Sequence, residues 1–217
     1  AEDRLGDFGY KPTLVIEQFE RQVMREIDLR LEMNSLRRME GLFEDDPRMV
    51  FPTTYPDLTS ERVLCMERVE GVLLSHEEDG TFTEEERREI VAIGSDAVFR
   101  QCFEIGFFHA DPHPGNMFVL RTESKALARE GEGSGEPRVK LCFIDYGMTG
   151  SIDPGTQELL ADLVHGTING DLDRVVRVVV QLTDMSPRDA QSRAFRADVW
   201  EFISRFQTGS LADLEMG

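Results

Sequence analysis

Ten residues near the middle of the chain decide the fold: they read Phe-Phe-His-Ala-Asp-Pro-His-Pro-Gly-Asn and occupy positions 107–116. The prolines and glycine of this stretch interrupt regular structure, so we predict a rigid loop that leads into a strand. A further acid, Asp145, directly follows a predicted buried strand at 139–144. Charged groups that end a buried strand are costly unless they bind something. We therefore expect Asp111, Asn116 and Asp145 to form a ligand site.

The spacing of these three residues is the one that phosphoryl transfer requires. One carboxylate orients the attacking group, while an amide and a second carboxylate hold Mg²⁺ on the phosphates. Asp111 and Asn116 have the spacing of the kinase catalytic loop, and Asp145-Tyr146-Gly147 stands where kinases carry Asp-Phe-Gly. Asp111 is thus predicted to be the base or orienting residue, and Asn116 and Asp145 the magnesium ligands. Their joint spacing disfavours the alternative that all three only form turns and caps.

The sequence of residues 107–116 resembles the signature of the UbiB/AarF atypical kinase family, which is linked to ubiquinone biosynthesis and related isoprenoid-lipid metabolism. Glu26-Ile27-Asp28, followed by Glu32, is similar to the family's Glu-x-Asp motif on the helix equivalent to kinase αC. Asp28 and Glu32 are four positions apart and share a helix face. The resemblance implies that Glu32 pairs with the nucleotide-binding lysine.

Residues 63–71 resemble the strand and hinge of the same family. This likeness implies that the backbone of Glu67 and Val69 contacts adenine and that Met66 is the gatekeeper residue. The cofactors that the resemblance implies are therefore ATP and Mg²⁺.

The resemblance also implies an α+β, protein-kinase-like fold. Residues 71–217 would form a mostly helical C-lobe with the catalytic loop and the metal motif, and residues 1–70 a partial N-lobe. That partial lobe would hold the αC-like helix, the hinge and about two strands.

Local patterns predict the individual elements upstream of the loop. Apolar residues recur every three to four positions and predict a long amphipathic helix over 13–43, with a break near Asn34. Two β-type segments at 49–51 and 62–67 predict a hairpin-like pair. Thr83, followed by three glutamates, fits a capping box and predicts a helix from there to about residue 105.

Downstream, strands at 117–120 and 139–144 flank the polar, Gly-rich stretch 121–138, which predicts an elongated hairpin. The chain after residue 147 is predicted to be helical. N-cap residues mark the expected helix starts at Asp153, Asp171 and Ser186.

The lysines are Lys11, Lys125 and Lys140, and none precedes the αC-like helix within a predicted strand. The nucleotide-covering loop that such a lysine accompanies in the family has no counterpart either. We therefore expect a fragment that lacks the upstream half of the N-lobe and that, alone, binds nucleotide weakly and turns it over poorly or not at all.

Composition limits the partners. The net charge of −18 over 217 residues would repel a phosphate backbone, so nucleic acid is excluded as a partner. No apolar stretch is long enough to cross a bilayer, so we expect a cytoplasmic protein whose membrane contact, if any, is peripheral. The three cysteines form no CxxC pair and predict reduced thiols. Besides nucleotide, the resemblance implies an isoprenoid lipid or lipid-biosynthetic proteins as partners.

The predicted function is that of a Mg-ATP-dependent atypical kinase or ATPase of the UbiB type, linked to ubiquinone or other isoprenoid-lipid metabolism. Only residues 148–153 separate the metal motif from the next predicted helix, so no peptide-docking segment is present and phosphorylation of proteins in trans is disfavoured. One alternative is a small-molecule phosphotransferase of the aminoglycoside or choline kinase type. The other is a pseudokinase that serves as a nucleotide-binding module.

Two less favoured hypotheses complete the set. His109, Asp111 and His113 form His-x-Asp-x-His, which could hold a transition metal, although kinase-like loops use such histidines as braces. Four phenylalanines are interpreted as core residues in preference to a lipid groove: Phe99, Phe103, Phe107 and Phe108.

Overall fold

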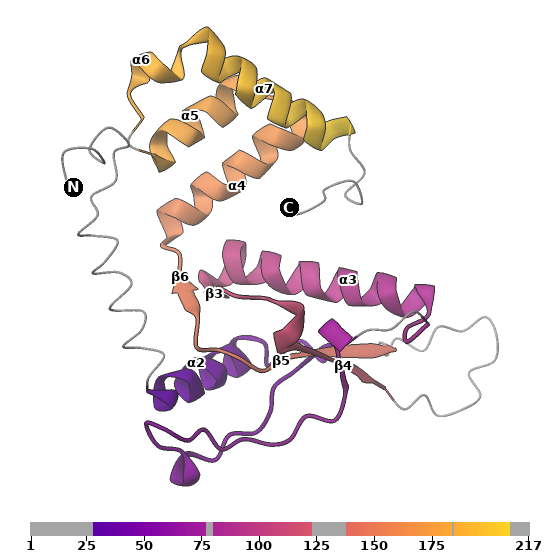
Figure 1. The fold of residues 1–217 in the computed structure, drawn as a ribbon. Coiled ribbons are helices and arrows are strands. Elements are labelled where there is room, and N and C mark those ends of the chain that lie inside the picture. The colour runs from indigo at the N-terminus through magenta and orange to yellow at the C-terminus, as the bar shows by residue number, and fades with distance from the viewer. Residues whose placement is uncertain (1–27, 77–79, 123–137, 184, 209–217) are drawn as a thin grey trace, which may run out of the picture. The chain divides into compact units, whose positions relative to one another are not determined.

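The computed structural model describes residues 28–76, 80–122, 138–183 and 185–208. The chain divides into two compact units, one made of residues 1–98 and 107–150 and the other of residues 99–106 and 151–217 (Figure 1). We describe each unit by itself. The predicted boundary between a partial N-lobe (1–70) and a C-lobe (71–217) is defined by function and not by these compact units, and it stays a prediction.

A four-stranded sheet forms the centre of the first unit, in the order β1-β5-β4-β2. β4 (Met117–Arg121) and β5 (Val139–Phe143) pair antiparallel, which confirms the predicted hairpin strands, although residues 123–137 of its loop lie outside the described residues. β2 (Val72–Leu73) pairs antiparallel with β4, and β1 (Met49–Val50) pairs parallel with β5. The inward side chains of β4 and β5 are fully buried, among them Val119, Val139 and Leu141.

The prediction for the segments 49–51 and 62–67 is only partly correct. Met49 and Val50 pair with β5 and not with the second segment. The second segment instead pairs with the residues that follow β1, where the Tyr55 N–H donates to the Cys65 carbonyl over 2.9 Å and the Glu67 N–H to the Thr53 carbonyl over 2.7 Å. The parallel partner on β5 is distant in sequence, so no local pattern signals it.

Helix α2 (Leu29–Leu42) carries the predicted αC-like motif, and its buried face contains Met33, Leu36 and Met39. Asp28 is its N-cap residue, since its side chain accepts a hydrogen bond from the Arg30 N–H. The helix runs through Asn34 without interruption, so the predicted break there is wrong. Asn34 is exposed and its side chain costs the helix little. The predicted helical residues before Asp28 lie outside the described residues.

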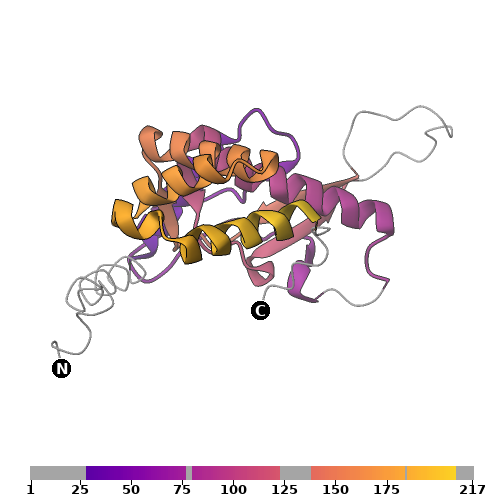
Figure 2. The ribbon, with the colours of Figure 1, turned by 90° about the horizontal axis from the view of Figure 1, so that it is seen from above.

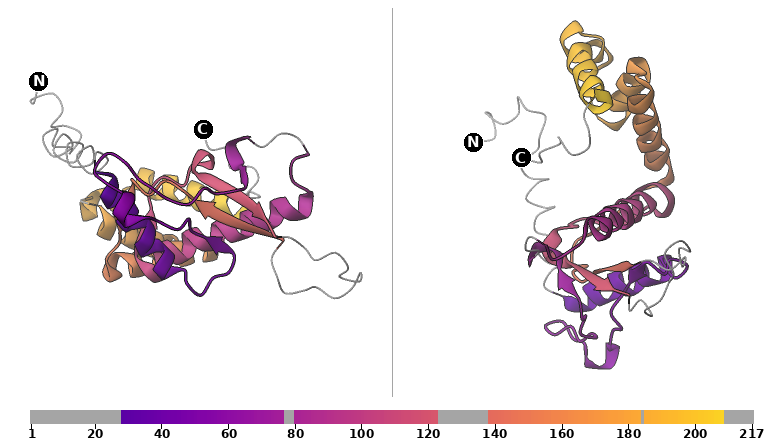
Figure 3. Two further views of the ribbon diagram at one scale, coloured as in Figure 1. Left: turned by 90° about the horizontal axis from the view of Figure 1, so that it is seen from below. Right: turned by 90° about the vertical axis from the view of Figure 1, so that its right-hand side faces the viewer.

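Helix α3 (Glu84–Phe99) begins at the predicted capping box. The Thr83 N–H donates to the Glu86 carboxylate over 2.8 Å, and the Glu86 N–H donates to the Thr83 hydroxyl over 3.2 Å. The helix lies along the sheet (Figure 3). Its Gly94 lies beside the Leu141 side chain of β5. Glu86 also binds the Arg121 guanidinium over 2.7 Å and so ties the start of the helix to β4.

The predicted helix does not remain an α-helix to residue 105. A π-helical turn, η5 (Arg100–Ile105), replaces its last part and ends at Gly106, which has a left-handed φ of 69°. A Cβ at Gly106 would stand 2.7 Å from the Ile152 carbonyl oxygen, so glycine is required there for both conformation and space. Gln157 donates from Nε2 to the Cys102 carbonyl, which the wider turn frees from the α-helical pattern.

The loop at 107–116 is more regular than predicted. Phe107–His109 form strand β3, which pairs with β6 (Thr149–Ser151) in a second, two-stranded sheet, and Pro114–Asn116 form a 3₁₀ turn, η6. Two further 3₁₀ turns lie at Pro56–Leu58 (η3) and Leu74–His76 (η4). Gly150 is packed against the Phe108 ring, so these two short strands are in close contact.

The second unit is helical, as predicted. α4 (Pro154–Asn169) and α5 (Leu172–Leu182) begin at the predicted caps Asp153 and Asp171, and α6 (Pro187–Ala190) and α7 (Arg193–Thr208) follow. The helices α4, α5 and α7 lie side by side (Figure 2) around a core that contains Val175, Val199 and Ile203. No helix among the described residues is long and apolar enough to cross a membrane.

Candidate functional site

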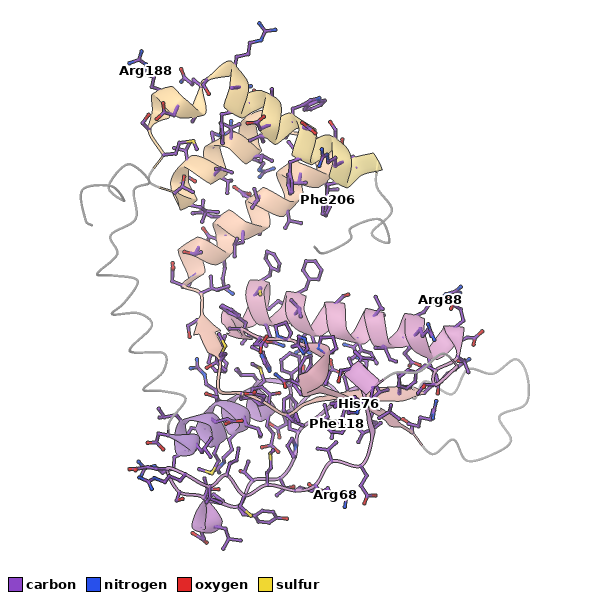
Figure 4. The ribbon with its side chains drawn as sticks, viewed as in Figure 1. Arg68, His76, Arg88, Phe118, Arg188 and Phe206 are labelled. Carbon is purple, nitrogen blue, oxygen red and sulfur yellow. The ribbon has the colours of Figure 1, made fainter. Side chains whose placement is uncertain are left out.

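A cavity of about 710 Å³ lies in the first unit beside the predicted hinge. Its wall is the continuous segment 66–71, and the remaining lining residues are Phe118 of β4 and Ile144, which follows β5. Figure 4 labels Phe118 together with Arg68 from the hinge side. The structure thus brings Met66, Glu67 and Val69, the residues with a predicted role in adenine binding, to one cavity.

The hinge segment leaves backbone groups available in this cavity. The Glu67 N–H is taken by the Thr53 carbonyl, and the Glu67 carboxylate accepts from the Thr53 N–H over 3.2 Å, so Glu67 is held at its upstream end. Within the described part of the chain, the Val69 N–H donates to no carbonyl. Gly71 passes so close to β4 that a Cβ would stand 2.8 Å from the Val119 carbonyl oxygen. The segment between Glu67 and Gly71 is therefore anchored at both ends and has free backbone in the middle.

The register of β4 and β5 brings the two predicted metal ligands together. Met117 pairs with Phe143, and the Ile144 N–H donates to the Asn116 carbonyl over 3.0 Å. Asn116 therefore lies across from the residue that directly precedes Asp145. Asp145 is exposed and forms a tight turn in which its Oδ1 accepts the Gly147 N–H over 3.0 Å, which fixes the direction of its carboxylate.

An amide oxygen and a carboxylate are hard ligands of the kind that Mg²⁺ prefers. Among the described residues there is no group of three or more His, Cys, Asp or Glu side chains that could hold a metal by themselves. Asn116 and Asp145 thus offer donor atoms of the kind that a magnesium ion would take, and its remaining ligands would have to come from phosphate and water.

The histidines of the loop brace its backbone. His109 is buried, and its Nδ1 accepts the Asp111 N–H over 3.1 Å. His113 accepts the Gly115 N–H at its own Nδ1 over 3.0 Å. Burial lowers the pKa of His109, against the opposing effect of the Asp145 and Asp111 charges. Asp111 itself is exposed and lies two residues after the end of β3, so its carboxylate is open to a ligand.

Glu32 of α2 faces the metal motif. Its Oε1 accepts the Tyr146 N–H over 3.4 Å, and burial together with the charge of Asp145 raises the pKa of this carboxyl. Lys140 is the one lysine among the described residues, and no described cation forms an ion pair with Glu32. The predicted lysine partner therefore remains a prediction, whereas the contact with Tyr146 was not foreseen.

Tyr146, the middle residue of the motif, is the largest fully buried side chain of the chain as described. Its ring lies 5.1 Å from the His109 ring and 6.4 Å from the Phe51 ring, measured between centroids. Its hydroxyl is buried without a hydrogen-bond partner among the described residues. The motif is therefore packed inward at Tyr146 while Asp145 faces outward.

Two lining residues of the cavity were missed by the sequence reasoning. Phe118 lies two positions after Asn116, and Ile144 directly precedes Asp145. Both belong to strands that had been predicted, so the missing information was the pairing of those strands. An antiparallel pair that ends at Asn116 and Asp145 places the apolar neighbours of both residues on the same surface.

The first unit combines a four-stranded sheet, a cavity lined by the hinge segment and an αC-like helix, and the second unit is helical. These are the parts of a kinase-like fold. A search of solved structures agrees: the complex of Rv3197 with erythromycin from Mycobacterium tuberculosis matches with a TM-score of 0.64 and 19% identity, over 92% of this chain and 46% of that one. The predicted fold class is thereby confirmed.

The chain belongs to the ABC1 atypical kinase-like family, whose domain profile matches residues 4–179. Among curated relatives, the probable protein kinase UbiB of Actinobacillus pleuropneumoniae is 27% identical over 95% of this chain and 36% of its own length. The chloroplastic ACTIVITY OF BC1 COMPLEX KINASE 1 of Arabidopsis thaliana is 26% identical over 84% of this chain and 25% of its own length. The chain therefore spans about a third of the length of these relatives, and the predicted UbiB/AarF resemblance is confirmed.

Proposed function

We propose that this chain binds Mg-ATP in the hinge cavity, as part of an atypical kinase or ATPase. The observation that carries the proposal is the continuity of the site: the same cavity is lined by Met66–Gly71 at one end and by Ile144, the neighbour of Asp145, at the other. A nucleotide has its base and its phosphates at opposite ends. The cavity offers backbone groups of the hinge to the base, and the predicted metal ligands Asn116 and Asp145 are sequence neighbours of its lining strands.

The base would bind to the backbone. The Val69 N–H and the Glu67 carbonyl are the groups proposed to contact adenine, and the Phe118 ring offers an apolar surface for the flat base. Met66 lines the same cavity, and as the proposed gatekeeper its flexible side chain would limit the depth to which the base enters.

The phosphates would need a cation. Asp111, Asp145 and Glu32 are all acidic, so the phosphates of an unaccompanied ATP anion would be repelled by the side chains around the metal motif. Asn116 and Asp145 would hold the Mg²⁺, which neutralises the phosphates when bound. Asp111 would orient the attacking group, and its exposed position on a braced loop suits that role.

The context proposed for this activity is ubiquinone or other isoprenoid-lipid metabolism, with a lipid or lipid-biosynthetic proteins as partners, and it rests on the family. Family membership favours this function over an aminoglycoside or choline kinase. A pseudokinase remains a second candidate because no described cation pairs with Glu32. A nucleotide-binding module without turnover would keep the same cavity.

A thermal-shift titration with ATP and ADP, with and without Mg²⁺, tests the proposal, because a ligand that binds only the folded state raises its stability. We expect a Mg²⁺-dependent rise that Asp145→Asn abolishes. The matched control is Asp57→Asn, which removes an exposed acid of η3 that does not line the cavity. A shift that persists in Asp145→Asn would refute the metal assignment, and phosphate release by the wild type would separate an enzyme from a pseudokinase.

A further inference from the structure

One side of helix α2 contacts the strands of the loop and of the metal motif at three places. Glu32 accepts the Tyr146 N–H, the Ser35 and Thr149 hydroxyls lie 3.4 Å apart, and the Arg38 guanidinium lies 4.0 Å from the centre of the Phe107 ring. Each of these α2 residues lies three positions after the previous one, so they lie on successive turns and on the same side of the helix. All of these residues belong to the first compact unit.

The two short strands that α2 contacts, β3 and β6, are close in sequence to the predicted catalytic and metal-binding residues. Phe107 begins β3, which ends two residues before Asp111, and Thr149 begins β6, which follows the metal motif. The Ala110 N–H donates to the Met148 carbonyl over 2.9 Å and so joins the two segments. A displacement of α2 would therefore move Asp111 and the residues around Asp145 together.

The charge of Arg38 faces an aromatic ring, whereas the charges of Arg48 and Arg30 face carboxylates. Arg48 binds the carboxylates of Asp46 and Asp96, and Arg30 binds that of Asp28. Arg38 has no carboxylate partner among the described residues and lies over Phe107, a ring that is only 5% exposed. A guanidinium over an aromatic face is attracted by its negative centre. The exposed Arg38 is thus fastened to a buried residue of β3.

We propose that Arg38 is a positioning residue, which holds α2 against β3 and thereby keeps Glu32 on Tyr146 and the metal motif in its binding position. This proposal rests on the proposed function where it concerns nucleotide. Its physical part, the coupling of α2 to the motif, concerns the ligand-free chain and can be tested without any ligand.

The test compares Arg38→Met with Arg37→Met. Both variants replace an exposed arginine of α2 by a side chain of similar length, but Arg37 has no ring or carboxylate partner among the described residues. The first readout is hydrogen exchange of the Tyr146 amide in the ligand-free chain. The second is the Mg²⁺ concentration that gives half of the ATP-induced thermal shift.

We expect Arg38→Met to increase the exchange rate of the Tyr146 amide by about two- to fivefold, which is the usual effect of losing an exposed cation–ring contact. The Mg²⁺ concentration that gives half of the thermal shift should rise by about the same factor. Arg37→Met should change neither. In a Phe107→Leu background, Arg38→Met should have no further effect on exchange, because the ring through which it acts is gone.

Equal Tyr146 exchange in the two arginine variants would overturn the positioning role, whatever happens to nucleotide binding. Faster exchange in Arg38→Met in a chain that shows no Mg-ATP binding at all would keep the coupling and overturn the proposed function. An effect of Arg38→Met that persists undiminished without the Phe107 ring would refute the route through β3.

Discussion

The buried hydroxyl of Tyr146 makes a sharp prediction about stability: replacing it by phenylalanine should stabilise the protein. The side chain is 1% exposed, and its oxygen has no hydrogen-bond partner among the described residues. A buried polar group without a partner costs about 1–3 kcal/mol. Removal of one oxygen atom leaves the ring contacts with His109 and Phe51 in place, so most of this cost should be recovered.

The assay is thermal and urea unfolding of Tyr146→Phe beside wild type. A gain of about 1–2 kcal/mol corresponds to a rise in Tm of roughly 2–8 °C for a protein of this size. Tyr55→Phe is the matched control, since Tyr55 is 44% exposed and its hydroxyl is in water, and it should leave the Tm unchanged.

The pH dependence gives the prediction a second check. Burial raises the pKa of Tyr146 well above its ordinary value of 10.0, because the phenolate cannot be hydrated in the core. Wild type therefore keeps its full stability below pH 10 and loses it as the pH rises further, since the unfolded chain ionises first. The phenylalanine variant lacks this loss. The reasoning would be refuted if Tyr146→Phe were less stable than wild type. It would also be refuted if the stability advantage of the variant over wild type became smaller above pH 10.

Three further predictions concern the frame around the site. Thr83→Ala should lower the free energy of unfolding by about 1 kcal/mol in urea titrations, because the Glu86 N–H loses its cap; no loss would contradict the capping box. Asp46→Asn should cost about 2 kcal/mol by the same assay, since the buried carboxylate accepts three hydrogen bonds from Arg48, one from its backbone N–H and two from its guanidinium. A neutral result would mean that the pair contributes nothing. Glu32→Gln should stabilise the ligand-free chain at pH 7 and leave its stability unchanged near pH 3, because the raised pKa of Glu32 means that the folded state disfavours the ionised carboxylate. The same difference in unfolding free energy between variant and wild type at both pH values would refute this electrostatic account.

The sequence predicted what is encoded locally. The capping box at Thr83 and the helix starts at Asp153 and Asp171 are correct to the residue, because side chains a few positions apart decide them. The strands β4 and β5 are also close to prediction, since two short apolar runs separated by a polar loop are local signals.

What failed depends on contacts between distant segments. The strands β3 and β6 have three residues each and exist only through each other, so Phe107–His109 were predicted as irregular loop. The π-helical turn at Arg100–Ile105 follows from a single extra residue per turn, which periodicity cannot resolve in six residues. Of the site, the spacing of Asp111, Asn116 and Asp145 was visible in the sequence and their roles stay predictions, whereas the placement of Phe118 and Ile144 in the cavity required the strand register.

The central claim is that one cavity holds a nucleotide from the hinge to the metal ligands, and a hydrogen-exchange footprint of Mg-ATP tests it most directly. The account predicts slower exchange at both ends of the cavity, at the Val69 amide and at the amides around Asp145, only when Mg²⁺ and ATP are both present. Protection confined to one end, or protection elsewhere on the chain with neither end affected, would contradict it.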